Sequence, residues 1–366
     1  MQVPHFESNV GAAERDAVAR VIESGWITEG KEAAAFVAEL QALTGAPYAV
    51  LAPNGTLALA MALLALNVGP GDEVIVPAST FIGSATAVTL AGATPVFCEV
   101  DPVHYQMTVS DADRARTFRT RAIMPVHLYG AVCAMEELLP YAQHHGLHVV
   151  EDAAQAIGIT RNGQHAGTFG VIAGMSFFAD KSVTTGEGGL VMTTDPQLYQ
   201  RLREIRNQGR RDRGYYVHPT IGYNFRMTDL QAAMGRVQLA RLPDTKQEKL
   251  RVFAGYQRRL EGLPVTLLVA DPVTSFIPHR IVAQFDDARQ AEVFLRARGV
   301  EARTTYMPMP YQPCFAHLPS ASLPFPNAQA LYDRGLMLPS YPTMSEQAVA
   351  YVCAQIRAYC EDAAST

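Results

Sequence analysis

Short apolar segments rich in β-branched residues alternate with helix-like segments over the first two thirds of the chain. The apolar segments that read as buried strands lie at 71–77, 94–100, 121–130, 147–155, 173–179 and 188–194. Helix-like spacing of apolar residues occurs between them, as at 84–93 and 135–146. Strands that alternate with helices favour right-handed crossovers and a mostly parallel sheet covered by helices. The pattern therefore predicts an α/β fold.

The pattern changes after a long helical stretch at 229–263, which Pro243 interrupts. Beyond it, strand-like and helix-like segments lie at 275–285, 288–299, 300–307 and 345–359. We therefore expect a large domain over residues 1–244 and a small α+β domain over residues 245–366.

Composition narrows the class of protein. The 366 residues carry a formal charge of -5, which argues against the basic face that binding to nucleic acid needs. No apolar run reaches the ~20 residues of a membrane-spanning helix, and the N-terminal residues lack the regions of a signal peptide. The five cysteines are scattered without CxxC spacing. We therefore expect no metal site, no disulfide framework and a reducing cytoplasmic location.

Three features converge on the expected carboxyl ends of the strands, where open α/β sheets bind ligands. Asp152 ends one strand, and Ser176 and Lys181 lie at the end of another. The tripeptide at 54–56, Asn-Gly-Thr, precedes a helix whose first N–H groups suit a phosphate. A phosphate site, a carboxylate and a lysine are the groups with which proteins hold pyridoxal 5'-phosphate (PLP).

The residue types suit that chemistry. Lys181 would form an imine with the cofactor and act as the mobile base, and an apolar site near a cation lowers the pKa of an amine as both tasks require. Asp152 would keep the pyridine nitrogen protonated. Each feature also has an ordinary interpretation. Lys181 could be a surface lysine, residues 54–56 could form a turn or a helix cap, and Asp152 could be one of the acidic residues that favour a helix start. The glycine-rich stretch 184–189 lacks the spacing of nucleotide-binding loops, and the joint occurrence at strand ends favours PLP.

The whole chain resembles the DegT/DnrJ/EryC1/StrS sugar aminotransferases. The resemblance is carried, in the order of the family, by NGTLALAMALLAL (54–66), VVEDAAQAIG (149–158), SFFADKSVTTGEGG (176–189) and IGYNFRMTDLQAA (221–233), among other segments. It implies the aspartate-aminotransferase fold (PLP fold type I), PLP as cofactor and transamination as the reaction.

The resemblance also implies a role for each candidate residue. Lys181 is implied as the Schiff-base lysine, Asp152 as the partner of the pyridine nitrogen, Gln155 as a neighbour of the phenolic oxygen and Phe81 as the aromatic that stacks on the ring. The implied phosphate contacts are Gly55, Thr56 and Ser176, together with Asn224 from a neighbouring subunit. A homodimer with shared active sites follows from that last contact. From the residues by themselves, a core role for Phe81 and a cap or turn role for Asn224 are favoured.

Within the family, segments 123–130, 181–189 and 218–233 most resemble GDP-perosamine synthases. Those enzymes transfer an amino group from glutamate to C4 of GDP-4-keto-6-deoxymannose, which implies biosynthesis of a deoxyamino sugar for O-antigen lipopolysaccharide. Ile157 and Pro310 depart from the family, which often has histidine at these positions near the sugar.

Several alternatives stay open. The acceptor could be a dTDP-linked 4-keto or 3-keto sugar or an aminocyclitol precursor, and a PLP-binding sensor without turnover is a different class of function. A dehydratase of the same fold would replace the reactive lysine with histidine, whereas this chain has Lys181. Arg226 is a candidate for the glutamate carboxylate, and His218 and Tyr223 are candidates for reaching a partner's site.

Overall fold

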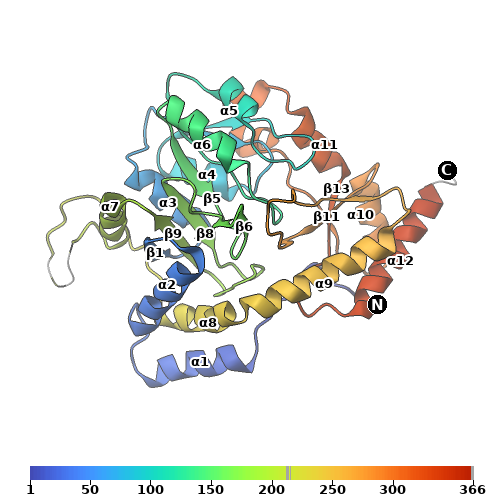
Figure 1. The fold of residues 1–366 in the computed structure, drawn as a ribbon, viewed down its shortest axis with the longest axis horizontal. Coiled ribbons are helices and arrows are strands. Elements are labelled where there is room, and N and C mark those ends of the chain that lie inside the picture. The colour runs from blue at the N-terminus through green and yellow to red at the C-terminus, as the bar shows by residue number, and fades with distance from the viewer. Residues whose placement is uncertain (212–213, 215, 364–366) are drawn as a thin grey trace.

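The computed structural model describes residues 1–211, 214 and 216–363. Its larger unit is built on a seven-stranded sheet with the strand order β1-β9-β8-β5-β4-β2-β3 (Figure 1). These strands are β1 (Tyr48–Ala52), β2 (Glu73–Pro77), β3 (Thr94–Cys98), β4 (Thr120–Ile123), β5 (His148–Asp152), β8 (Ile172–Ser176) and β9 (Gly189–Thr193). A separate small hairpin pairs β6 (Thr160–Arg161) with β7 (Gln164–His165).

Strand pairing confirms the mostly parallel sheet that the sequence predicts. Strands β3, β2, β4, β5 and β8 are parallel neighbours, whereas β9 is antiparallel to both β8 and β1. The strands predicted from apolar segments are all present, as β2, β3, β4, β5, β8 and β9. The edge strand β1 is an addition to that prediction.

Helices cover both faces of this sheet, because alternate side chains of each buried strand point to opposite faces. In β2, Val74 and Val76 join the apolar core that includes α3 and α4, whereas Ile75 joins the core that includes α2 and α6. The helices of the larger unit are α1 (Ala12–Glu23), α2 (Lys31–Thr44), α3 (Gly55–Ala65), α4 (Gly83–Leu90), α5 (Val109–Ala115), α6 (Met135–His144), α7 (Pro196–Arg206) and α8 (Asp229–Ala240).

A smaller antiparallel sheet lies beyond the long helix α9 (Leu242–Leu260), toward the C-terminus in Figure 1. Its strand order is β10-β11-β13-β12. The strands are β10 (Thr266–Leu267), β11 (Ile281–Gln284), β12 (Arg303–Thr304) and β13 (Gly335–Leu338), and the helices are α10 (Ala288–Arg296), α11 (Pro326–Arg334) and α12 (Glu346–Ala363). Short 3-10 helices occupy Met309–Tyr311, Pro313–Phe315 and Pro319–Ser322. Pro243 lies in the first turn of α9, where a missing N–H is tolerated, and this confirms the predicted interruption.

Helix α9 joins the two units. Its residues Val252 and Tyr256 belong to the apolar core of the smaller unit, which also includes Val3. Val3 pairs with Val300 in a parallel bridge. The first residues of the chain therefore lie with the smaller unit, and a domain boundary at residue 244 stays a prediction.

Three negative observations apply to the residues that the structure describes. None of their helices combines the length and the apolar character that crossing a bilayer requires. They contain no group of three or more His, Cys, Asp or Glu side chains placed to hold a metal ion. The cysteines are free thiols, of which Cys98, Cys133 and Cys353 are buried.

A close backbone contact holds the loop after β4 against the segment before β11. Gly130 has a φ of 102°, and a Cβ at this position would lie 2.1 Å from the carbonyl oxygen of Ile277. Gly146 also has a positive φ, of 64°, but no atom of the described residues lies within 4 Å of where its Cβ would be. Both glycines thus have a backbone conformation that would strain a residue with a Cβ, and they differ in steric room.

We expect Gly130→Ala to lower the free energy of unfolding by roughly 3 kcal/mol, because a left-handed backbone and a collision with Ile277 each cost about 1–3 kcal/mol. Gly146→Ala is the matched control and should lose only about 1 kcal/mol, from backbone strain. Urea unfolding of both variants measures the difference. Equal losses would mean that the contact with Ile277 does not constrain the fold.

Candidate active site

A cavity of about 560 Å³ opens at the carboxyl ends of β5 and β8. The predicted site residues that line it are Gly55, Thr56, Phe81, Asp152, Gln155, Ser176 and Lys181. A larger groove of about 820 Å³ lies among α1, α2, α8 and α9, and none of the predicted site residues is among the described residues that line it. The chemistry predicted from the sequence thus converges on one cavity, at the place where α/β sheets bind ligands.

Lys181 lies in the loop that leads from β8 back to β9, and its side chain is 13% exposed. Burial lowers the pKa of its amine; the carboxylate of Asp180 opposes this decrease and Arg280 adds to it. The Nζ atom lies 3.5 Å from Nε2 of His279, an imidazole whose pKa burial holds well below its ordinary value. A lowered pKa favours the neutral amine, which is the nucleophilic form.

Asp152 is the last residue of β5, and its carboxylate is held by two hydrogen bonds. The Ser84 hydroxyl donates to Oδ2 at 2.7 Å, and the Ala154 N–H donates to Oδ1 at 3.0 Å. Burial raises the pKa of Asp152, and these two hydrogen bonds counteract the rise. Sequence reasoning missed Ser84, because its segment carries a helical pattern and no chemical motif.

The start of α3 approaches the end of β8 closely. The side chain of Asn54 caps α3 by accepting a hydrogen bond from the Leu57 N–H at 2.9 Å. A Cβ on Gly55 would lie 2.7 Å from the Cβ of Ser176, so a larger residue would fill the space between helix and strand. The Thr56 and Ser176 residues border the same cavity. Hydroxyl groups around a helix N-terminus suit a phosphate group.

Aromatic rings border the cavity on the side of the smaller unit. Tyr306, which follows β12, meets Phe81 edge-on with ring centroids 5.7 Å apart and stacks on Tyr129 at 6.0 Å. The amide nitrogen of Gln155 lies 3.4 Å from the Tyr306 hydroxyl, and its Oε1 accepts from the Tyr129 N–H at 2.9 Å. Phe81 is 54% exposed, which excludes a core role. Tyr306 was not predicted, because the residues it contacts lie at least 151 positions away in the chain.

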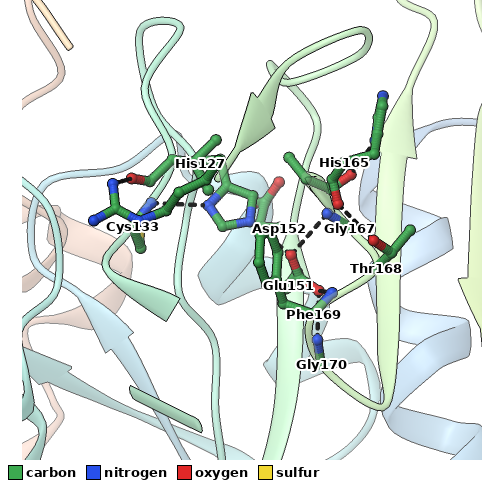
Figure 2. A network of polar contacts seen from close by, with 12 residues as sticks. His127, Cys133, Glu151, Asp152, His165, Gly167, Thr168, Phe169 and Gly170 are labelled. Atoms are coloured by element: carbon green, nitrogen blue, oxygen red, sulfur yellow. Dashed lines mark hydrogen bonds and ion pairs between the residues drawn. The ribbon is translucent and has the colours of Figure 1, made fainter. Parts of the chain in front are cut away.

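A buried polar network lies behind Asp152 (Figure 2). Glu151 is fully buried and accepts hydrogen bonds from the backbone N–H groups of Gly167, Phe169 and Gly170 at 2.6–2.7 Å. On its other side, Oε2 lies 2.8 Å from Nε2 of His127, whose Nδ1 faces the Cys133 N–H at 3.3 Å. The contact with the Cys133 N–H places the imidazole proton on Nε2, so that His127 donates to Glu151.

Asn224 lies outside this cavity. Its side chain is exposed, and its Oδ1 accepts a hydrogen bond from Nε of Arg226 at 2.8 Å. His218 and Tyr223, in the same stretch, are also exposed and do not line the cavity. The single chain therefore brings none of these residues to Lys181, and their reach into a neighbouring subunit stays a prediction.

The two positions that depart from the family are buried. Ile157 is 6% exposed and packs in the core that includes α2 and α6, and Pro310 is buried within the 3-10 helix Met309–Tyr311. Neither is among the described residues that line the cavity.

Residues 8–357 match the DegT/DnrJ/EryC1/StrS aminotransferase family. The chain belongs to this family. The enzyme is thus a sugar aminotransferase that depends on PLP, and solved structures of similar fold include a PLP form of a putative sugar aminotransferase from Streptococcus pneumoniae, at a TM-score of 0.93 and 26% identity over 99% of each chain.

Three further relatives cover almost the whole aminotransferase. The GDP-perosamine synthase of Caulobacter vibrioides is 38% identical over 96% of each chain. The UDP-N-acetyl-3-dehydro-alpha-D-glucosamine 3-aminotransferase of Acidithiobacillus ferrooxidans is 39% identical over 93% of this chain and 92% of its own. The crystal structure of DesV from Streptomyces venezuelae has a TM-score of 0.92 at 36% identity and covers 98% of this chain and 99% of that one.

The cavity of this aminotransferase fits PLP. A carboxylate, a buried amine and a helix start with two hydroxyl side chains are the groups that the cofactor's ring nitrogen, aldehyde and phosphate require. Gly55 lets the start of α3 approach Ser176 closely, since a Cβ at this position would lie 2.7 Å from the Ser176 Cβ, and this brings the Ser176 hydroxyl to the helix start that would hold the phosphate.

We expect Glu151→Gln to lower the free energy of unfolding by about 2–4 kcal/mol, because an amide NH2 would face buried N–H donors that the carboxylate now satisfies. The control is Glu137→Gln on the exposed side of α6, which should stay within about 0.5 kcal/mol of the original protein. Urea unfolding of both variants provides the measurement. If the two variants lose the same stability, the network around Glu151 contributes little.

Proposed function

We propose that this enzyme transfers the amino group of glutamate to C4 of a nucleotide-linked 4-keto-6-deoxy sugar, with GDP-4-keto-6-deoxymannose as the first choice. The observation that carries this proposal is near full-length similarity to GDP-perosamine synthases from three organisms. Those of Caulobacter vibrioides, Escherichia coli O157:H7 and Vibrio cholerae are 38%, 35% and 34% identical to this chain. The product would be GDP-perosamine, a deoxyamino sugar of the kind used in O-antigen lipopolysaccharide.

A second candidate is amination at C3 of a keto sugar. It is favoured by the 39% identity to the UDP-N-acetyl-3-dehydro-alpha-D-glucosamine 3-aminotransferase and by 38% identity to a dTDP-3-amino-3,4,6-trideoxy-alpha-D-glucose transaminase. Ile157 and Pro310 stand where the resemblance implies histidines near the sugar, and neither is among the described residues that line the cavity. The position of the acceptor carbon therefore has to be measured.

The proposed roles of the charged residues follow from their surroundings. When bound, PLP supplies an aldehyde that reacts with amines and a ring that accepts electrons. The Nζ atom of Lys181 would hold the aldehyde and, once the substrate amine has displaced it, would move the proton that the transfer requires. The Asp152 carboxylate, oriented by Ser84, holds a proton on the ring nitrogen through a charge-assisted hydrogen bond.

The remaining residues would hold and orient the cofactor. Gly55, Thr56 and Ser176 bind the phosphate at the start of α3, Gln155 contacts the phenolic oxygen, and Phe81 covers the ring. Asn224 would complete the phosphate site of a second copy, so we propose a homodimer, the commonest closed assembly. The exposure of Asn224 away from its own cavity supports this assignment. Glutamate as donor and a cytoplasmic location belong to the same proposal.

Sodium borohydride reduction of the PLP-loaded enzyme should fix the cofactor to Lys181, because this amine lies in the cavity and has a lowered pKa. Mass spectrometry of proteolytic peptides locates the modified lysine. The matched comparison is Lys249, which is also buried and has a pKa lowered to about 7, mainly by burial, but does not line this cavity. Modification of Lys249 or Lys246 in place of Lys181 would refute the assignment.

The acceptor is tested by supplying glutamate with GDP-linked and dTDP-linked 4-keto sugars, a UDP-linked 3-keto sugar and a keto-inositol. We expect kcat/KM to be highest for GDP-4-keto-6-deoxymannose, since a site built to bond particular hydroxyl groups discriminates strongly against sugars that misplace them. Formation of 2-oxoglutarate measures turnover for each acceptor. A tenfold or greater preference for the 3-keto sugar or the keto-inositol would exclude amination at C4 and leave the cofactor chemistry in place.

A further inference from the structure

The carboxylate of Asp180 lies between two cations. Its Oδ2 accepts a hydrogen bond from Nη2 of Arg280. Its Oδ1 is buried, has no hydrogen-bond partner among the residues that the structure describes, and lies 3.9 Å from Nζ of Lys181. A distance of 3.9 Å is too long for a hydrogen bond, although it is short enough for strong attraction in a site with little water.

Arg280 comes from the smaller unit, directly before β11, and its side chain is 8% exposed. Its guanidinium also lies over the ring of Phe6, with Cζ 5.7 Å from the ring centroid. Arg280 therefore packs on Phe6 and bonds one oxygen of the Asp180 carboxylate, Oδ2, whereas Lys181 lies near the other, Oδ1. An arginine held in this way acts as a permanent positive charge, because it does not lose its proton in proteins.

Other charged or titratable groups also face Lys181. Asp152 favours the protonated amine, as Asp180 does, whereas Arg280 disfavours it. His279, whose Nε2 is 3.5 Å from Nζ, and the buried amine of Lys249 on α9, which repels a charge on Lys181, also lie nearby. After burial, the carboxylate of Asp180 has the largest effect on the pKa of Lys181, and it raises that pKa. The position of this carboxylate therefore matters more than that of any other charge named here.

We propose that Arg280 is a positioning residue that holds the carboxylate of Asp180 away from the amine of Lys181. With the arginine in place, the attraction of the carboxylate is divided between two cations, and Lys181 remains free to face the cavity. Without it, Oδ1 or Oδ2 would close on Nζ to ordinary hydrogen-bond distance, and the lysine would be held as an ion pair. The smaller unit would thus keep the reactive amine available through a single guanidinium.

The test is a spectroscopic pH titration of the full-length, PLP-loaded enzyme, in which the absorbance of the cofactor reports protonation of the Lys181 nitrogen. Arg280→Met keeps a long side chain over Phe6 and removes the charge. It should raise the apparent pKa by about one unit, which is a tenfold change in the unprotonated fraction at a given pH. Asp180→Asn should shift the pKa in the opposite direction.

Two further variants separate positioning from a structural role. Arg280→Lys keeps the charge and should titrate close to the original enzyme. The double variant Arg280→Met with Asp180→Asn should return the titration toward the original value, because the carboxylate that captures the amine is gone. An unchanged titration in Arg280→Met, or a double variant that titrates like Arg280→Met, would overturn the proposal.

This inference rests on the proposed role of Lys181, and the two can fail separately. Borohydride modification of a different lysine would refute the proposed role itself. Modification of Lys181 together with an unchanged titration in Arg280→Met would refute only the positioning by Arg280.

Discussion

The burial of the Glu151 carboxylate is the constraint on which the geometry of the site depends. An ionised group without water must be surrounded by donors, and here three backbone N–H groups and His127 provide them. The backbone donors belong to the loop that leads into β8, and His127 belongs to the segment after β4. One side chain, at the end of β5 beside Asp152, therefore ties together segments that belong to three neighbouring strands, β8, β5 and β4 (Figure 2).

Side chains alternate between the two faces of the sheet along β5, so the adjacent residues Glu151 and Asp152 have different surroundings. Glu151 points to one face, where it is fully bonded, and Asp152 points to the other, into the cavity. A change in the orientation of Asp152 would require the backbone at the end of β5 to move, and the bonds to Glu151 oppose that movement. The Asp152 carboxylate is thus held in position because its neighbour Glu151 is anchored.

Much of the fold follows from local sequence, and the exceptions have physical reasons. The buried parallel strands are recognisable because they are apolar on both faces, as in β2. The strands β1 and β13 are only five and four residues long, and they take their place from long-range pairing, Tyr48 with Thr193 and Ile281 with Leu338. Their existence depends on partners far away in the chain.

The candidate site divides in the same way. Residues in local motifs, such as Lys181 before its glycine turn and Asp152 at a strand end, could be predicted and do line one cavity. Ser84, Tyr306 and Arg280 could not, because each matters through a contact with a residue 68 to 151 positions away. The role of a side chain that belongs to no sequence motif can be recognised only from its contacts in the folded chain.

The hairpin between β8 and β9 has a consequence for how such an enzyme can diversify. Ser176 and Gly189 are paired across adjacent antiparallel strands, so the loop that carries Lys181 starts and ends within one strand spacing. The crossover connections elsewhere in the sheet can lengthen or shorten without moving these two ends. Insertions in the rest of the chain therefore leave the position of Lys181 unchanged. The residues that line the cavity can change to bind other acceptors while the amine stays in place.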